Sequence, residues 1–329
     1  MALGVIYMTS PLVSVLIPVY NRASLISAAI ESSLAQTYQN IEIIIVDNCS
    51  TDGTYEVVQR YARCDARVKC WRNDENVGAI RNWIKCLDYS HGEYIKILFS
   101  DDWLEPDAVQ SLLLPLQKHN DVGFSYSSVT THFEDTEHVI LSYSQKRPGV
   151  MNRDEFLRGV LTDRPSVPVS PGCALFRRKD VERGLEYPIP DHFGLQCNEK
   201  GIGSDLLIFL RTCDSYPHVY YIDRPLSHFR GHRGSISLSH SRQFNSLCYD
   251  IAFGWFLGTS NLPADQKQIL NGFLLGKSLN PSRFQIANTL NPWRIYKLLF
   301  PKGYLYASFR WRHVIEMIWF KIGNRLNSG

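Results

Sequence analysis

Two adjacent acids, Asp101 and Asp102, lie just beyond an apolar run that reads as a buried strand, Tyr94 to Leu98. Adjacent carboxylates at the end of a buried strand repel each other and lose hydration, so they require a cation or strong hydrogen-bond donors nearby. A divalent metal ion on a nucleotide diphosphate would supply that cation. The same acids could instead cap the helix that opens around Pro106. These residues alone leave metal binding and helix capping equally open.

An alternation of strand and helix patterns places more polar residues at the same edge as these acids. The strand-like runs are apolar on both faces, which is typical of a parallel sheet covered by helices on both sides. Ligands of such sheets bind at the carboxyl ends of the strands, where Asn21, Asp47 and Asp101 follow. The expected strands are Val13–Ile17, Ile41–Val46, Val68–Trp71 and Tyr94–Leu98, and the expected helices are Ser24–Gln36, Tyr55–Ala62 and Ile80–Tyr89.

Beyond residue 107 the alternation weakens, and the pattern predicts a mixture of elements with a long loop over residues 187–203. From residue 243 onward the sequence reads as helical, apart from a basic aromatic tail. The expected helices are Ala108–Lys118, Arg153–Leu161, Lys179–Arg183 and Asp205–Thr212, and the expected strands are Val122–Thr131 with a hairpin partner His138–Tyr143, Ala174–Phe176 and Val219–Ile222.

Composition sets outer bounds on the class of protein. The chain has 329 residues, of which 44% are hydrophobic, enough for one large domain or two small ones. A net charge of +3 is too small to indicate a nucleic-acid partner. The eight cysteines show no C-x-x-C pair or zinc-finger spacing, as in proteins of a reducing compartment. With no signal peptide and no apolar run of about 18 residues, we expect a cytoplasmic protein.

The ordered motifs of roughly the first 235 residues resemble those of the family 2 glycosyltransferases, inverting enzymes with the GT-A fold. The segment Ser14–Arg22 resembles the first strand and nucleotide loop of that family. Asp47–Thr54 is similar to its D-x-S-x-D-G-T segment. Residues 73–82 resemble N-x-G-x-x-x-A-R-N. The matching residues are Asn76, Gly78, Arg81 and Asn82.

Three later segments extend the resemblance, two of them with departures. Leu98–Asp102 matches L-D-S-D-D except that Phe99 replaces the first acid. Gly203–Asp205 stands where the family has an E-D pair, with Ser204 in place of the glutamate. Residues 230–232 resemble the late Y-R-x-H segment.

The resemblance implies an α/β fold of the GT-A type, a Rossmann-like and mostly parallel sheet flanked by helices, with a C-terminal helical extension. The glycosyltransferase domain is expected at residues 1–240, with a nucleotide-sugar-binding half at 11–107 and an acceptor half at 108–240. Residues 241–329 are then a helical extension that ends in the basic aromatic tail.

The resemblance also implies a reaction in which one sugar moves from a nucleoside-diphosphate sugar to a hydroxyl of a saccharide acceptor with inversion. A UDP-sugar is the favoured donor. Processive synthases of the family carry Q-x-x-R-W and membrane spans, whereas Ala307 stands at the glutamine position before Arg310 and Trp311. The acceptor is therefore expected to be a growing oligosaccharide on a lipid or a protein, as in bacterial surface glycans.

Site residues follow from positions in the motifs. Asp102 is expected to bind Mg²⁺ or Mn²⁺ together with His232, and Asp205 is expected to be the catalytic base that deprotonates the acceptor. The residues expected at the nucleotide sugar are Pro18, Tyr20, Asn21, Arg22, Asp47, Asn76, Arg81 and Asp101.

Several of these residues also have a plain structural interpretation. Tyr20 could serve packing, and Asp47 could shape a turn or cap a helix. Arg81 could be a solvated helix residue, and His232 a surface histidine between two arginines. Asp205 could cap the helix that follows it.

Two other classes of function compete with a transferase. A catalytically degenerate sugar- or nucleotide-binding protein of the same fold is supported only by Phe99 and Ser204. A nucleotidyltransferase would need a glycine-rich loop after the first strand, and Pro18–Arg22 contains no glycine. Two further histidines, His228 and His240, carry no functional signal in the sequence.

The segment Trp293–Arg325 interleaves aromatic and aliphatic residues with lysine and arginine. That composition suits peripheral contact with anionic lipid on the inner face of the cell membrane. The alternative is a C-terminal helix packed on the core with a basic outer face. Both interpretations stay open at this point.

Overall fold

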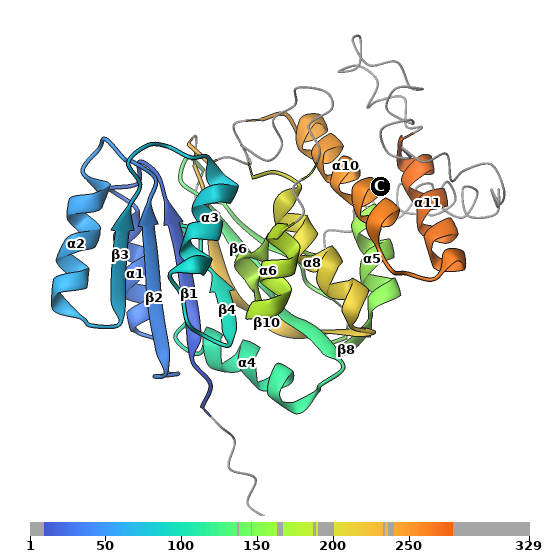
Figure 1. The fold of residues 1–329 in the computed structure, drawn as a ribbon, viewed down its shortest axis with the longest axis horizontal. Helices are drawn as coiled ribbons and strands as arrows, with labels where there is room; N and C mark the ends of the chain where they lie inside the picture. Colours follow the sequence, from blue (N-terminus) through green and yellow to red (C-terminus); the bar gives the residue numbers. More distant parts are fainter. Residues whose placement is uncertain are drawn as a thin grey trace, which may run out of the picture.

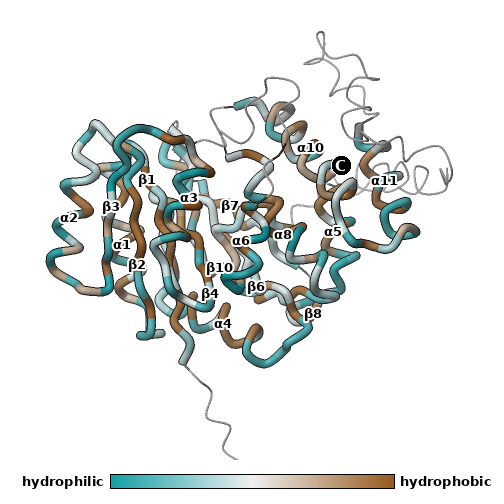
Figure 2. Tube along the Cα trace, viewed as in Figure 1, coloured by the Kyte–Doolittle hydropathy of each residue, from teal (hydrophilic) through white to brown (hydrophobic). Residues whose placement is uncertain are grey.

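The computed structural model describes residues 10–136, 138–145, 147–162, 167–186, 189, 201–232, 234–235 and 240–278. Ten strands in these ranges form one sheet with helices on both faces (Figure 1). Apolar residues concentrate on the strands and on the helix faces turned toward them (Figure 2). The predicted α/β fold class is therefore confirmed.

The first four long strands form the parallel half of the sheet, in the order β3-β2-β1-β4. The two central strands, β1 and β2, are rich in valine and isoleucine and are buried on both faces, because helices cover both sides. Each expected element of this half is present within a few residues. The strands are β1 (Val13–Val19), β2 (Ile41–Asp47), β3 (Val68–Arg72) and β4 (Tyr94–Ile97), and the helices are α1 (Ile26–Leu34), α2 (Thr54–Cys64) and α3 (Ala79–Asp88).

The second half of the sheet is mixed. Strand β9 (Ala174–Arg177) inserts antiparallel between β4 and β6 (Val122–Phe133), and β10 (His218–Gly231) runs parallel to β6. The expected hairpin is confirmed, because β7 (Val139–Ser142) pairs antiparallel with β6. Two strands that the sequence pattern did not predict, β5 (Trp103–Leu104) and β8 (Gly149–Asn152), pair antiparallel with β10.

The strand predicted at Val219–Ile222 is much longer than expected, since β10 continues to Gly231. The prediction stopped at Asp223-Arg224-Pro225, which reads as a turn. The structure passes these residues with register shifts against β6, the usual way for a strand to accommodate a proline. This extension brings the residues around His232 to the carboxyl edge of the sheet.

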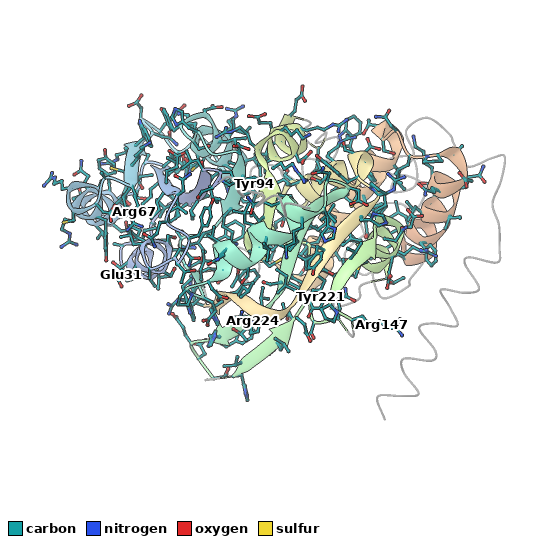
Figure 3. All side chains as sticks on the ribbon, turned by 90° about the horizontal axis from the view of Figure 1, so that it is seen from below. Glu31, Arg67, Tyr94, Arg147, Tyr221 and Arg224 are labelled. Atoms are coloured by element: carbon teal, nitrogen blue, oxygen red, sulfur yellow. The ribbon has the colours of Figure 1, made fainter. Side chains whose placement is uncertain are left out.

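Helices of the second half cover both faces of the sheet. On one face, α3, α5, α6, α8 and α10 enclose the larger core, and on the other α1 and α4 enclose the smaller one. Seen from below, α4 crosses the sheet between Glu31 of α1 and Tyr221 of β10 (Figure 3). The remaining elements are α4 (Ala108–Lys118), α5 (Arg153–Leu161), η1 (Pro171–Cys173), α6 (Arg178–Glu186), α8 (Ser204–Ser215), α10 (Arg242–Thr259) and α11 (Ala264–Ser278).

Helices α10 and α11 agree with the helical reading from residue 243 onward. The basic aromatic tail and most of the loop predicted at 187–203 lie outside the described residues. Within the described ranges, every helix falls short of the length and apolarity that a membrane span requires.

Candidate functional site

A cavity of about 550 Å³ opens where β1 and β4 end and extends toward α8 and α10. Strand ends of a parallel sheet are the usual ligand position, because the chain leaves the sheet there and side chains become available. The predicted site residues that line the cavity are Pro18, Tyr20, Arg22, Asp101, Asp102 and Asp205.

Asp101 and Asp102 contact hydrogen-bond donors at and just after the end of β10, and they do not cap the next helix. The backbone N–H of Arg230 donates to Asp102 Oδ1 at 2.9 Å, and His232 Nε2 lies 2.9 Å from Asp101 Oδ2. The N-cap of α4 is Asp107, so the alternative that Asp101 or Asp102 caps this helix is wrong. Burial and the Asp101 charge raise the pKa of Asp102 well above its usual range. A cation placed beside the two carboxylates would relieve that repulsion.

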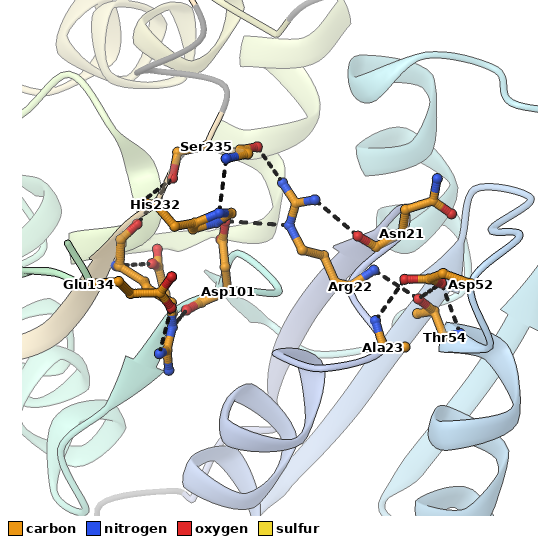
Figure 4. A network of polar contacts seen from close by, with 12 residues as sticks. Asn21, Arg22, Ala23, Asp52, Thr54, Asp101, Glu134, His232 and Ser235 are labelled. Atoms are coloured by element: carbon orange, nitrogen blue, oxygen red, sulfur yellow. Dashed lines mark hydrogen bonds and ion pairs between the residues drawn. The ribbon is translucent and has the colours of Figure 1, made fainter.

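Arg22 connects the loop after β1 to the segment after β10 (Figure 4). Its Nη2 donates to the Gly234 carbonyl at 2.8 Å, and its Nε lies 3.6 Å from Asp101 Oδ2. Asp101 therefore sits between a guanidinium and the His232 imidazole. Because the Arg22 side chain is only 20% exposed and lines the cavity, it presents a fixed positive charge to any anionic ligand there.

Asn21 shapes the loop that carries Arg22. Its φ of 51° lies in the left-handed region, which asparagine tolerates better than most residues. The side-chain Oδ1 accepts from the N–H of Thr51 at 2.9 Å, and the Asn21 N–H donates to Ser50 Oγ at 2.8 Å. Asn21 thus holds the β1 and β2 loops together and is not among the residues that line the cavity.

Two predicted contacts, Asp47 and Asn76, are not among the residues that line the cavity. Asp47 is fully buried, accepts from the N–H of Ser50 and lies 3.3 Å from Arg72 Nε. Asn76 is exposed, and its Oδ1 accepts from Asn48 Nδ2 at 2.8 Å, where Asn48 is the residue that lines the cavity. Asp47 therefore orders the loop after β2, and Asn76 orients the Asn48 side chain.

Arg81 points away from the cavity and is exposed, whereas its neighbour Asn82 is buried and lines it. Asn82 Nδ2 donates to the Val46 carbonyl at 3.0 Å, and its Oδ1 accepts from Asn73. The solvated-helix interpretation of Arg81 agrees with this placement. The motif therefore contributes its last asparagine to the cavity.

Asp205 lies at the start of α8, with its carboxylate directed into the cavity wall. Its Oδ1 accepts from the N–H groups of Gly203 and Leu206, both at 2.8 Å, and its Oδ2 accepts from Tyr249 OH at 3.1 Å. Gly203 occupies the N-cap position, so Asp205 is not the N-cap residue. Burial raises the pKa of Asp205 to about 7, despite these three hydrogen bonds. A carboxylate with such a pKa is a suitable general base near neutral pH.

The sequence analysis did not identify the aromatic side of the cavity. Trp83 and Phe99 pack at a ring separation of 5.5 Å, and Phe229 and Phe99 both approach Gly172. A Cβ at Gly172 would lie 3.1 Å from Phe229, so only glycine fits this floor without displacement. Phe99, noted as a departure from the family pattern, was the one signal available. It forms part of an apolar floor where an acid was expected.

Lys96 lies beneath this floor and is fully buried. Its Nζ donates to the Ile97 carbonyl at 3.2 Å and to the Gly172 carbonyl. Burial lowers the pKa of Lys96 to about 8. A lysine in a strand ordinarily indicates a solvent-facing position, so the burial of Lys96 could not be predicted from its residue type.

The site contains donors that suit a divalent cation but does not enclose one. Within the described ranges, no three histidine, cysteine, aspartate or glutamate side chains converge on a metal-sized point. Asp101 and Asp102 supply hard carboxylate oxygens of the kind that Mg²⁺ and Mn²⁺ prefer. His232 directs Nε2 to Asp101, so it would have to exchange that partner to become a ligand. The residues fit a cation whose remaining ligands come from phosphate and water.

The profile described as glycosyl transferase family 2 matches residues 14–185. The putative glycosyltransferase EpsH of Bacillus subtilis (strain 168) is 29% identical over 272 residues, which cover 82% of this chain and 75% of that protein. The Escherichia coli UDP-Glc:alpha-D-GlcNAc-diphosphoundecaprenol beta-1,3-glucosyltransferase WfaP is 33% identical over 156 residues, or 47% of this chain and 53% of that protein. The crystal structure of S. aureus TarS 1–349 in complex with UDP-GlcNAc superposes with a TM-score of 0.66 at 16% identity, covering 87% of this chain and 79% of that chain.

Proposed function

Because the chain belongs to glycosyl transferase family 2, we propose that it moves one sugar from a nucleoside-diphosphate sugar to a hydroxyl of a saccharide acceptor, with inversion. The observation that carries the proposal is the single cavity that Asp101, Asp102 and Asp205 share. A diphosphate leaving group needs charge neutralisation at one end of the reaction centre, and the attacking hydroxyl needs a base at the other. The acidic pair would hold the cation that neutralises the diphosphate, and Asp205 would act as the base.

The donor is proposed to bind with its base and ribose against the loop after β1 and its diphosphate near the acidic pair. Tyr20 and Pro18 offer an apolar edge, and Arg22 offers the charge that a phosphate oxygen requires. UDP is the favoured nucleotide, since the printed names of both WfaP and the TarS complex contain a UDP-sugar.

A bound Mg²⁺ or Mn²⁺ would offset the charge that develops on the departing diphosphate. Asp102 would hold it, with Asp101 and His232 as the neighbouring groups that orient the site. Arg22, whose Nε lies 3.6 Å from Asp101 Oδ2, would contribute further positive charge beside the acidic pair. Arg230 holds Asp102 through its backbone N–H, so this carboxylate is already oriented before any ligand binds.

Asp205 is proposed to accept the proton of the acceptor hydroxyl as the oxygen attacks the anomeric carbon. Attack from the side opposite the diphosphate forms one C–O bond while the bond to the phosphate oxygen breaks, and this single displacement inverts the centre. The bonds from Gly203, Leu206 and Tyr249 fix the carboxylate in one orientation. Fixed orientation is a large part of what a general base contributes.

The acceptor is proposed to be a lipid-linked saccharide. WfaP, by its name, acts on a sugar linked to diphosphoundecaprenol, which supports a carrier of that chemical class. A peripheral contact of the tail at 293–325 with the inner membrane surface would bring the cavity to such an acceptor. That segment lies outside the described residues, so this contact rests on its composition alone.

The test is a transfer assay with purified protein, a panel of UDP-, GDP- and dTDP-sugars, Mn²⁺, and undecaprenyl-diphosphate saccharides as acceptors. We expect one nucleotide to be released in an acceptor-dependent manner, and the anomeric proton coupling of the product to report inversion. Tight nucleotide binding with neither transfer nor donor hydrolysis across the panel would favour the degenerate binding protein. Phe99, which replaces an acid in the motif, is the observation that keeps that second function open.

A further inference from the structure

Two residues of β10, His228 and Arg230, and the residue that follows the strand, His232, contact the segment that carries the acidic pair. Their spacing of two places them on the same side of an extended chain. We call these three residues the clasp. Strand β5 runs antiparallel beside β10, with His228 opposite Trp103. Moving forward along β10 therefore means moving backward from Trp103 toward Asp101.

The contacts of the clasp follow this antiparallel order, so that later residues of the clasp contact earlier residues of the acidic segment. His232 binds the Asp101 carboxylate, and Arg230 donates from its backbone to Asp102 and from Nε to the Asp101 carbonyl at 3.1 Å. The Arg230 guanidinium lies 5.1 Å from the Trp103 ring centre. These two residues touch the site already described.

The third member of the clasp, His228, does not line the cavity. Its ring stacks on Trp103 with 5.2 Å between centres and 10° between planes. Its Nε2 lies 2.7 Å from Glu105 Oε1, and its Nδ1 lies 2.5 Å from Thr130 Oγ1. Only 12% of its side chain is exposed. His228 thus ties β5 and Glu105 to both β10 and β6.

The segment that carries Asp101 and Asp102 forms a short edge of the sheet. Strand β5 is two residues long and ends the strand order, with β10 as its neighbour. On its other side Gln36 Nε2 donates to the Glu105 carbonyl at 2.8 Å, which holds the backbone but not the Glu105 side chain. The two carboxylates lie next to each other, so their mutual repulsion acts to separate them, and side-chain contacts such as those of His228 oppose that repulsion.

We propose that His228 is a positioning residue that holds Asp101 and Asp102 in the geometry that binds the cation–diphosphate, acting through Glu105 and Trp103. The inference rests on the proposed function, because it assigns the acidic pair to that ligand. It predicts that breaking the His228–Glu105 contact weakens cation-dependent nucleotide binding without unfolding the protein. A neighbour that orients a metal-binding group typically changes affinity by about 10- to 100-fold when it is removed.

The experiment measures UDP affinity by calorimetry with and without Mn²⁺, together with the melting temperature. We expect His228→Gln and Glu105→Gln each to weaken Mn²⁺-dependent UDP binding by about 10-fold. UDP binding without Mn²⁺ should be unchanged in both. Since Glu105 is 41% exposed, its amide variant should fold even if a substitution at His228 does not. The double variant should be no weaker than either single variant, because both remove the same contact.

Two further variants separate this role from packing. His228→Phe keeps an aromatic ring against Trp103 but cannot bind Glu105, so it should lose affinity as His228→Gln does. The matched control is His218→Gln on the same strand, because His218 forms a comparable 2.8 Å pair with Asp121 away from the cavity. Its nucleotide affinity should equal that of the wild type.

The results divide cleanly between the inference and the proposed function. Wild-type protein that binds none of UDP, GDP and dTDP with Mn²⁺ would overturn the proposed function and the inference with it. Wild-type protein that binds, beside folded His228→Gln and Glu105→Gln variants with affinities within twofold of it, would overturn the inference alone. Normal affinity in His228→Phe would reduce His228 to a packing residue, which also contradicts the proposal.

Discussion

Replacing Asp205 by asparagine is expected to move activity and stability in opposite directions. Only 8% of Asp205 is exposed, and burial raises its pKa to about 7, against an ordinary value of 3.8. A carboxyl group whose pKa rises on folding binds its proton more tightly in the native state, so ionising it destabilises the fold. This destabilisation grows as the pH rises from the pKa of Asp205 in the unfolded state to its pKa in the folded state, and it is complete above about pH 7.

The difference between the two pKa values corresponds to roughly 4 kcal/mol, which is the largest gain in stability that an uncharged replacement could give. The amide of Asp205→Asn retains an oxygen that can accept from the N–H groups of Gly203 and Leu206. We therefore expect the variant to be more stable than the wild type at pH 8, by up to ~4 kcal/mol. The difference in the free energy of unfolding between the variant and the wild type should narrow as the pH is lowered toward 4.

Turnover of Asp205→Asn should fall by roughly two to four orders of magnitude, because an amide cannot accept the acceptor proton. Wild-type kcat/KM should rise with pH through about 7, and the residual rate of the variant should not follow that curve. Donor affinity should change little, since the lost interaction belongs to the transition state. The measurements are urea unfolding from pH 5 to pH 8.5, the transfer rate, and nucleotide affinity.

Asp180 of α6 provides a matched control. It is also buried, with its pKa raised by burial, and lies away from the cavity. Asp180→Asn should gain stability at pH 8 and keep the wild-type transfer rate. Near-normal turnover in a well-folded Asp205→Asn protein would move the base elsewhere, with Asp191, which lies outside the described residues, as the next candidate. A variant less stable than the wild type at pH 8 would contradict the pKa argument.

Three further substitutions and one truncation test other parts of the molecule. Asp102→Ala should leave the fold intact and abolish the Mn²⁺-dependent part of UDP binding in calorimetry; full transfer activity of this variant would exclude the proposed cation ligand. Gly92→Ala would place a Cβ 2.6 Å from the backbone nitrogen of Ser14, so it should cost about 1–3 kcal/mol in urea unfolding. At the exposed Gly258 of α10, no described atom outside the helix's own backbone lies within 4 Å of a new Cβ, so Gly258→Ala should instead stabilise by about 0.5–1 kcal/mol. Deleting residues 293–325 should reduce sedimentation with anionic liposomes while UDP affinity stays the same, and equal sedimentation would exclude the membrane contact.

The parallel half of the fold was predictable because its signals are local. Strand β2 contains four consecutive apolar β-branched residues, Ile43 to Val46, and the helices beside it show apolar residues at helical spacing. The order β9 between β4 and β6 was not predictable, since pairing between distant strands leaves no periodic trace in a single sequence. The predicted strand at Val219–Ile222 ends too early, because a proline such as Pro225 is typical of a strand end. In the structure, register shifts against β6 allow β10 to continue past Pro225.

The candidate site was also predictable only in part. Motif positions indicated which loops meet, and Arg22, Asp102 and Asp205 do line one cavity. Motif positions could not distinguish a residue that lines the wall from one that supports it, as with Asp47. His228 carried no functional signal by itself, because its partner Glu105 lies 123 residues away in sequence. Its alternation with Arg230 and His232 was a usable signal only once the strand was known to continue.

The clasp also has a consequence for the timing of synthesis. The Asp101 side chain is made 131 residues before the imidazole that holds it. At ribosomal rates of about 5–20 residues per second, this gap lasts roughly 6 to 26 seconds. During that time β1 to β4 can pair with one another, because their contacts are local, while the acidic pair has no partner from β10. A chain released before residue 230 would lack both contacts from this part of the chain, and Arg22 would remain as a partner of Asp101. We therefore expect such a truncated product to bind nucleotide more weakly than the full chain does.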